Sequence, residues 1–317
     1  MNIVVLDGYT LNPGDLSWSE LEELGQLTVY DRTSQQDIIK RAAEADILLT
    51  NKTIITAGTM QCLPMLKYIG VLATGYNLVD TEAARFKGIV VCNIPTYSTA
   101  SVAQNTFAHL LHITNQVGYY ATENRNGRWS QSPDFCYWQS PIMELSGKMF
   151  GVIGMGHIGE TVTRIAQAFG MQVCAYTSRT EEDLPQGVIK MSLEDLLKQS
   201  DVVSLHCPLN ASTRQLINRE RLALMKPSAI LLNTGRGNLV NEEHLAEALH
   251  QGVISAYGAD VLSVEPASPL NPLLSAPNAY ITPHIAWASF EARQRLMHIC
   301  AENIRAFLRG TPQNTVR

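Results

Sequence analysis

A glycine-rich turn between an apolar run and an amphipathic segment constrains this chain more than any other feature of its sequence. The turn reads Gly154-Met155-Gly156-His157-Ile158-Gly159; it follows the run Met149–Ile153 and opens the segment Ile158–Phe169, which Gly170 can close. In such a strand–turn–helix unit, the first glycine permits the tight turn, the second lets the backbone approach a pyrophosphate, and the third lets helix pack on strand. The first N–H groups of the helix then face the phosphates. The pattern predicts a dinucleotide site; a turn that merely requires small residues is the alternative.

Short β-branched runs alternate with helical patterns along almost the whole chain. In the first third, the expected strands are Ile3–Asp7, Leu27–Tyr30, Ile47–Thr50, Tyr68–Leu72 and Ile89–Asn93. In the central part they are Met149–Ile153, Gln172–Tyr176, Val202–His206, Ile230–Asn233, Ile254–Asp260 and Tyr280–Thr282. Such alternation is typical of parallel sheets with helices on both faces. Two consecutive sets predict an α/β protein of two doubly wound, Rossmann-like domains separated by a cleft.

Two long segments without strand character define the expected domain boundaries. Val102–Tyr120 joins the two sets of strands, and Phe290–Leu308 reads as a long helix after the last strand. A helix at that point would bring the chain back to the first domain. We therefore expect a discontinuous substrate domain, residues 1–100 and 288–317, and a dinucleotide-binding domain inserted at 101–287. A chain of 317 residues is long enough for two separate cores.

The stretch Asn124–Met143 is rich in Ser, Gln and Pro and carries four aromatic residues, Trp129, Phe135, Tyr137 and Trp138. This composition favours a loop or an arm whose aromatic side chains do not simply face water.

Composition and charge exclude several classes of protein. The net charge of −5 and the lack of a run of five basic residues argue against a nucleic-acid-binding or membrane-surface protein. No apolar stretch approaches the ~20 residues of a transmembrane helix, and the N-terminus does not read as a signal peptide. The six cysteines are scattered without a C-x-x-C pair, which favours reduced thiols over a zinc site or a disulfide framework. We expect a cytoplasmic protein without a metal.

Charged side chains follow three of the expected strands at the point where each strand ends. Arg236 lies in Thr234-Gly235-Arg236-Gly237 after one strand, Glu265 comes shortly after the next, and His284 shortly after the last. Each residue alone has an ordinary alternative to a catalytic role. Arg236 could be a surface cation, Glu265 a solvated turn residue and His284 a hydrogen-bonded loop histidine. Together, at one edge of a parallel sheet, they supply a cation to hold a substrate, a carboxylate, and a group that exchanges a proton. Behind a dinucleotide turn, this set predicts hydride transfer with a nicotinamide.

The order of these motifs resembles the D-isomer-specific 2-hydroxyacid dehydrogenases, and the resemblance covers essentially the whole chain. Three further segments look most like the bacterial glycerate dehydrogenase (hydroxypyruvate reductase) branch: Leu6–Asp15, Ala73–Asp80 and Pro95–Gln104. The resemblance implies an NAD(P)-dependent enzyme that transfers a hydride between nicotinamide and a small 2-oxo acid, hydroxypyruvate or glyoxylate first and a larger aliphatic 2-oxo acid second. Two competing interpretations remain on the same fold: a short-form phosphoglycerate dehydrogenase, and a coenzyme-sensing, corepressor-like binding protein.

The resemblance also implies roles for individual residues. His284 would be the acid–base residue, and Glu265 would hydrogen-bond its other ring nitrogen and favour the imidazolium form. Arg236 would bind the substrate carboxylate and the reacting oxygen through its planar fork of donors. Backbone N–H groups of Ala73, Thr74 and Gly75 would take the other carboxylate oxygen.

Coenzyme positions follow from the same resemblance. Asp260 matches the residue that accepts a hydrogen bond from the nicotinamide amide. The remaining expected contacts are the turn residues Gly154, Gly156, His157, Ile158 and Gly159, together with Thr106, Cys207, Pro208 and Thr234. The aromatic arm would cross the interface of a homodimer and line the partner's substrate pocket.

The choice of coenzyme depends on the residues after Gln172–Tyr176. An acidic residue is expected there, about 20 residues beyond the glycines, to bind the ribose hydroxyls of NAD. This chain has Thr177-Ser178-Arg179-Thr180 instead. Ser178 and Arg179 could bind a 2′-phosphate, which slightly favours NADPH; alternatively, Arg179 is a solvated turn residue and NADH is still used.

Overall fold

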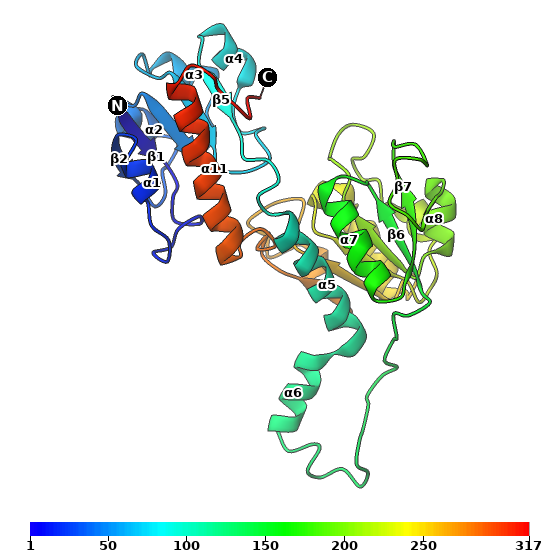
Figure 1. Cartoon of the computed structure of the whole chain (residues 1–317). Coiled ribbons are helices and arrows are strands. Elements are labelled where there is room, and N and C mark those ends of the chain that lie inside the picture. Colours follow the sequence, from blue (N-terminus) through cyan, green and yellow to red (C-terminus); the bar gives the residue numbers. More distant parts are fainter. Residues whose placement is uncertain (317) are drawn as a thin grey trace. The chain divides into compact units, whose positions relative to one another are not determined.

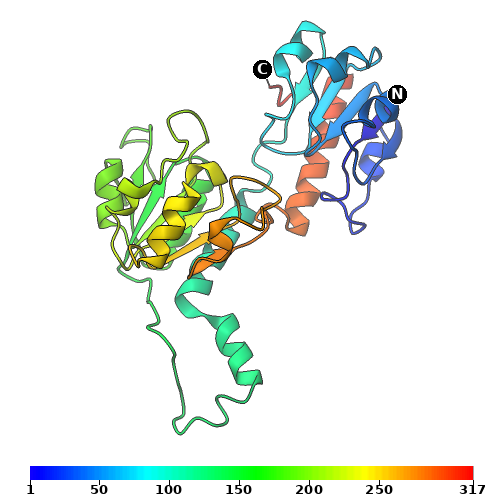
Figure 2. The same ribbon diagram turned by 180° about the vertical axis from the view of Figure 1, so that it is seen from behind.

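The computed structural model describes residues 1–316, which divide into two compact units. The first comprises Met1–Ser98 together with the chain from Ala288 onward, and the second is the continuous segment Thr99–Trp287. Figure 1 shows both, coloured along the sequence, and Figure 2 gives the reverse view. Each unit has its own buried core, as the alternation of strands and helices predicts.

The first unit is built on a five-stranded sheet in which every pairing is parallel, with the order β2-β1-β3-β4-β5. Its strands are β1 (Asn2–Val5), β2 (Gln26–Val29), β3 (Ile47–Thr50), β4 (Tyr68–Val71) and β5 (Val90–Cys92). Its shorter helices are α1 (Ser19–Glu22), α2 (Ile38–Ala42), α3 (Ala57–Gln61) and α4 (Thr81–Phe86). The long helix α11 (Phe290–Leu308), red in Figure 1, packs on this unit, with the ring of Phe307 4.9 Å from that of Tyr68.

The second unit contains a seven-stranded parallel sheet with the order β12-β11-β10-β9-β6-β7-β8. The strands are β6 (Met149–Ile153), β7 (Gln172–Tyr176), β8 (Val188–Lys190), β9 (Val202–Leu205), β10 (Ile230–Asn233), β11 (Ala256–Ala259) and β12 (Ala279–Ile281). The strand order reverses between β6 and β9, and ligands of open α/β sheets bind at such a reversal. The predicted α/β class with two Rossmann-like parallel sheets is confirmed.

Helices cover both faces of this second sheet. Helices α5 (Thr99–Asn115) and α7 (His157–Ala168) pack on one face, and α8 (Leu193–Gln199), α9 (Arg219–Leu222) and α10 (Glu242–His250) cover the other. Two 3₁₀ turns, η1 (Gly237–Leu239) and η2 (Pro272–Leu274), complete the unit. Side chains cap two of these helices: Ser192 accepts from the N–H of Asp195 at the start of α8, and Asn241 accepts from that of His244 at the start of α10.

The segment between the two sets of strands differs from the expected continuous stretch. Gln116 has a left-handed backbone, with φ of +51°, and separates α5 from a second helix, α6 (Val117–Arg125). No side chain of α6 is buried, and Figure 1 shows this helix and the following loop projecting away from the sheet of the second unit. Among residues 1–316, no helix is both long and apolar enough to traverse a bilayer.

Candidate active site

The glycine-rich turn leaves open space where a pyrophosphate would lie. Gly154 has φ of +97°, and a Cβ placed on it would lie 2.5 Å from the backbone nitrogen of Cys207. A Cβ on Gly159 would collide with the carbonyl oxygen of Gly154, whereas a Cβ on Gly156 would meet no heavy atom within 4 Å. Gly156 is also the N-cap of α7, and its helix end has no side-chain cap. These residues therefore fit a dinucleotide: two glycines are fixed by packing, and the third faces space in front of a helix N-terminus.

Five strands of the second sheet end in one row. Residues paired side by side across the sheet are Ile153, Leu205, Asn233, Ala259 and Ile281, each the last residue of its strand. Because all these strands are parallel, the chain leaves every one of them at the same edge. The glycine-rich turn, Cys207, Arg236, Asp260 and His284 thus lie on neighbouring loops.

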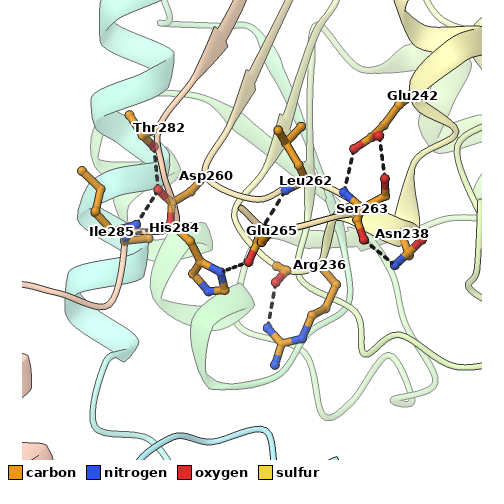
Figure 3. A network of polar contacts seen from close by, with 12 residues as sticks. Arg236, Asn238, Glu242, Asp260, Leu262, Ser263, Glu265, Thr282, His284 and Ile285 are labelled. Atoms are coloured by element: carbon orange, nitrogen blue, oxygen red, sulfur yellow. Dashed lines mark hydrogen bonds and ion pairs between the residues drawn. The ribbon is translucent and has the colours of Figure 1, made fainter. Parts of the chain in front are cut away.

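A histidine–carboxylate pair lies on this edge. The Nδ1 of His284 is 2.6 Å from Oε2 of Glu265, and the two side chains are 29% and 34% exposed. The other carboxylate oxygen of Glu265 accepts from the N–H of Leu262 at 3.1 Å. With Nδ1 engaged by the carboxylate, the Nε2 edge of the ring is the one available for a substrate. Figure 3 shows His284, Glu265 and Arg236 gathered at these loops.

Asp260 holds the loop that carries His284. Its buried carboxylate accepts from the N–H groups of Ile285 and Ala286 at 2.9 and 2.7 Å, and from the hydroxyl of Thr282 at 2.6 Å. The backbone of His284 has φ of +54°, and its N–H donates to the carbonyl of Asp260 at 2.8 Å. The family resemblance implies that Asp260 accepts from the nicotinamide amide; in the structure its carboxylate is occupied by the loop itself.

Behind this loop, Thr282 also connects Asp260 to a histidine of α5 that is not among the predicted site residues. The hydroxyl of Thr282 lies 3.0 Å from Nε2 of His109. Burial lowers the pKa of His109, and the charge of Asp260 partly opposes this effect.

Arg236 is exposed, and no carboxylate pairs with its guanidinium within the described chain. Its Nη1 donates to the carbonyl of Gly235 at 2.8 Å, and its own carbonyl accepts from the side-chain amide of Asn233 at 3.0 Å. The backbone is therefore fixed while most of the guanidinium donors remain available for an anion.

The other expected coenzyme residues differ in what their side chains can offer. The hydroxyls of Thr106 and Thr234 lie 2.9 Å apart in the interior, and Thr106 also donates to the carbonyl of Val102. Cys207 lies beside Gly154, and burial raises the pKa of its thiol to about 11, so the thiol is neutral at physiological pH. Pro208 is exposed next to it.

Arg179 already has a partner, which the sequence pattern does not reveal. Its Nη1 lies 2.5 Å from Oε1 of Glu160, in the first turn of α7, and the two side chains are about one-third exposed. Ser178 is exposed. An acidic residue at a helix start is ordinarily explained by the helix dipole, so nothing in the pattern connects Glu160 with a residue 19 positions away.

The expected carboxylate-binding loop lies in the first unit. Ala73, Thr74 and Gly75 follow β4, where the carbonyl of Ala73 accepts from the N–H of Ile94 and the hydroxyl of Thr74 donates to the carbonyl of Ile94. The side-chain amide of Asn93 donates to the carbonyl of Thr74 at 2.7 Å. Among residues 1–316, the N–H groups of Thr74 and Gly75 have no acceptor, so they can donate to a ligand.

Comparison with known proteins agrees with this geometry. The model of the D-isomer specific 2-hydroxyacid dehydrogenase NAD-binding domain matches residues 107–286. A hydroxypyruvate reductase of Blautia hydrogenotrophica is 48% identical over 100% of this chain and 99% of the relative. A glycerate dehydrogenase of Methylorubrum extorquens is 40% identical over 90% of each. The solved structure of an acyclic imino acid reductase with NADPH and D-Arg has a TM-score of 0.85 and 33% identity, covering 100% of both chains. The chain therefore belongs to the D-isomer specific 2-hydroxyacid dehydrogenase family and is an oxidoreductase acting on CH–OH groups with a nicotinamide coenzyme.

Proposed function

We propose that the protein is a hydroxypyruvate and glyoxylate reductase, which in the reverse direction is a D-glycerate dehydrogenase. The observation that carries the proposal is the 2.6 Å contact between His284 Nδ1 and Glu265 Oε2, at the sheet edge that also holds Arg236 and the open glycine turn. The names of the two relatives above supply the substrate class.

In this proposal the chain provides binding, orientation and a proton. The reduced nicotinamide, when bound, supplies a hydride to the carbonyl carbon of the substrate. His284 donates the proton of Nε2 to the carbonyl oxygen, and Glu265 keeps the ring oriented through its contact with Nδ1. Arg236 binds the substrate carboxylate and polarises the reacting oxygen through its N–H donors. The free N–H groups of Thr74 and Gly75 support the assignment of that loop to the second carboxylate oxygen. In the proposed arrangement, residues 1–98 with the segment from 288 form the substrate domain, and 99–287 form the coenzyme domain.

For the coenzyme we propose acceptance of both NADPH and NADH. Arg179 supplies a cation for a 2′-phosphate, as in the sequence-based preference for NADPH. The pairing of Arg179 with Glu160 reduces that preference, because a 2′-phosphate would meet the carboxylate and would compete for the guanidinium.

A homodimer is the assembly that we propose. The arm is the stretch of residues 124–143 that the sequence predicts as a loop or an arm. Three of its aromatic side chains are solvent-exposed in the single chain: Trp129 (54%), Phe135 (89%) and Trp138 (67%). Close to the base of the arm, Ala108, Leu111, His112, Asn115 and Val117 line a shallow, mainly apolar groove. Several large apolar side chains exposed together mark an interaction surface. The arm of a second copy would cover the exposed aromatic side chains and fill the apolar groove.

Initial rates of coenzyme oxidation test the proposed function. Hydroxypyruvate and glyoxylate should give a higher kcat/KM than pyruvate and phenylpyruvate, with NADH and with NADPH. Lack of turnover with all four 2-oxo acids would remove the reductase proposal. A higher kcat/KM with phenylpyruvate would keep the reaction but change the substrate class.

A further inference from the structure

Three residues connect the loop that carries Arg236 with the loop that carries Glu265. None of the three has a role in the proposed mechanism. Glu242 is the first residue of α10, and its Oε1 accepts from the N–H of Ser263 at 2.7 Å. Its Oε2 accepts from the hydroxyl of Ser263 at 2.6 Å and from the side-chain amide of Asn271 at 2.9 Å. Asn238 donates from its side-chain amide to the carbonyl of Ser263 at 3.3 Å. Figure 3 shows the side chains of Asn238 and Glu242 both directed at Ser263.

The two loops are also in direct backbone contact. A Cβ on Gly237 would collide with the carbonyl group of Leu262, so the chain at 237 lies directly against the chain at 262–263. A loop that is packed this tightly and hydrogen-bonded through N–H, carbonyl and hydroxyl of one residue has little freedom to shift. We call the set Asn238, Glu242 and Ser263 the loop bracket.

The loop bracket is immediately next to the groups that act on the substrate in the proposed function. Arg236 directly precedes Gly237, and Glu265 follows Ser263 by two residues. The N–H of Leu262, between the bracket and the catalytic pair, donates to Glu265 Oε1 at 3.1 Å. Nothing in the bracket contacts His284, so any effect of Glu242 on the proton transfer must pass through the position of Glu265.

We propose, on the basis of the function proposed above, that Glu242 is a positioning residue. By holding Ser263, it keeps Glu265 in contact with His284 and keeps Arg236 in a fixed position relative to that pair. The carboxylate suits this task because it accepts three hydrogen bonds at once, from a backbone N–H, a hydroxyl and an amide. Small errors in the geometry of reacting groups have large kinetic effects, on the order of 100-fold for a displacement of ~1 Å.

Substitution of Glu242 with a matched control tests the proposal. Glu242→Ala should lower kcat for 2-oxo acid reduction roughly 10- to 100-fold. Glu242→Gln, which keeps an acceptor for one of the Ser263 donors, should recover part of the loss. Glu243→Ala removes the same charge from an exposed neighbour in the same turn and should leave kcat within about two-fold. Coenzyme affinity and the melting temperature, measured on each variant, exclude unfolding as the cause.

Two further readouts separate positioning from a merely structural role. In Glu242→Ala, kcat for reduction should fall while the KM for the coenzyme stays within about two-fold, because the loop bracket holds the loops of Arg236 and Glu265 and not the glycine-rich turn 154–159. In a Glu265→Gln background, Glu242→Ala should lower kcat by less than about three-fold, since both changes remove the same support. Wild-type kcat in Glu242→Ala, or fully multiplicative losses in the double variant, would overturn the proposal for Glu242 alone. Unchanged kcat in Glu265→Gln would instead remove the role assigned to Glu265 and this inference with it, whereas only lack of turnover of all four 2-oxo acids by the wild type would remove the proposed function.

Discussion

At the scale of single residues, His284 has an unfavourable backbone conformation that surrounding hydrogen bonds stabilise. A left-handed backbone costs a residue with a Cβ roughly 1–2 kcal/mol, and His284 adopts it with φ of +54°. The cost is offset by Asp260, which collects the N–H groups of Ile285 and Ala286 and the hydroxyl of Thr282 in the interior. This arrangement turns the imidazole toward Glu265, and it explains why a loop histidine is fixed without being buried.

Replacement of His284 by alanine should lower kcat by about 10²- to 10⁴-fold, the usual contribution of a general acid–base group. Coenzyme affinity should stay within a few-fold, because the expected phosphate contacts lie on the separate turn 154–159. Steady-state rates and fluorescence titration with NADH and NADPH check both expectations. His298→Ala is a matched control, since that surface histidine also contacts a carboxylate, Glu20, at 2.9 Å. Equal losses in the two variants would contradict the assignment of His284.

Glu160 is expected to influence the choice of coenzyme through Arg179. Glu160→Gln should raise the ratio of kcat/KM for NADPH over NADH by about two- to five-fold, because a partly exposed ion pair contributes at most ~1 kcal/mol. The change frees the guanidinium and removes a negative charge near the expected 2′-phosphate. Glu182→Gln removes an exposed charge from the following loop and serves as the control. A ratio that falls or stays constant in Glu160→Gln would show that Arg179 does not face the phosphate.

At the scale of elements, the sequence predicted the buried strands best. The bounds of β3, β6, β7, β10 and the helix α11 agree with the structure at both ends. All four strands lie inside their sheets, with a neighbour on each side, so most of their residues are apolar and the pattern is unambiguous. The edge strand β8 was missed because Val188–Lys190 is short and two of its three residues are exposed. Edge strands need less apolar surface and so leave a weaker pattern.

The sequence predicts only those site residues whose location follows from their place directly after a strand. His284, Glu265 and Arg236 each follow a recognisable strand, and the sheet brings them to one edge. The side-chain contacts of Asp260, Glu160 and Glu242 could not be predicted. Each depends on which loop or helix turn lies opposite, and the separations along the chain are 19 to 29 residues. Hydrophobic periodicity describes which face of an element is buried, and it carries no information on such polar contacts.

The carboxyl end of β9 carries a histidine with an unusual protonation equilibrium. Burial lowers the pKa of His206 to about 4, and its Nε2 lies 2.8 Å from the hydroxyl of Ser204. Because the folded-state pKa lies below the ordinary value of ~6.5, the neutral form contributes stability that is complete above pH ~6.5. This contribution is lost as the pH falls from about 6.5 toward about 4, where the unfolded chain binds the proton and the folded chain does not.

NMR of the ring protons of His206, assigned with a His206→Asn variant, tests this expectation. The signals should not shift between pH 7.5 and 5. Thermal unfolding should also show a smaller loss of melting temperature between pH 7 and 5 in His206→Asn than in the wild type, measured at equal ionic strength. A titration of His206 near the value of a free histidine would contradict the assignment.

At the scale of the whole molecule, the chain crosses between its two units at 98/99 and at 287/288, and both crossings are anchored to α11. Arg295 donates from Nε to the carbonyl of Tyr97 at 3.0 Å, and Arg293 donates from Nε to the carbonyl of Ala288 at 3.0 Å. Arg293 is buried and forms a two-pronged ion pair with Asp15 at 2.7 and 2.6 Å. Helix α11 therefore holds both connecting segments to the first unit. These contacts explain why the chain returns to the first unit after the second.

The arm provides the test of assembly. In a single chain, Phe135 is 89% exposed, and burial of such a ring is worth about 1.5–3 kcal/mol. If the arm packs on a second copy, Phe135→Asp should weaken the dimer by at least 10-fold in Kd, because a charge would replace an apolar contact. Phe86→Asp is the matched control, since Phe86 is 94% exposed on α4 of the first unit and lies outside the proposed interface. Light scattering coupled to gel filtration, over a dilution series, should show a dimer for the wild type and Phe86→Asp and a monomer for Phe135→Asp.

A rise in KM for hydroxypyruvate that accompanies dissociation would indicate that the partner's arm also contributes to the substrate pocket. A wild-type protein that is monomeric at micromolar concentration would instead mean that the exposed aromatic side chains of the arm serve another partner.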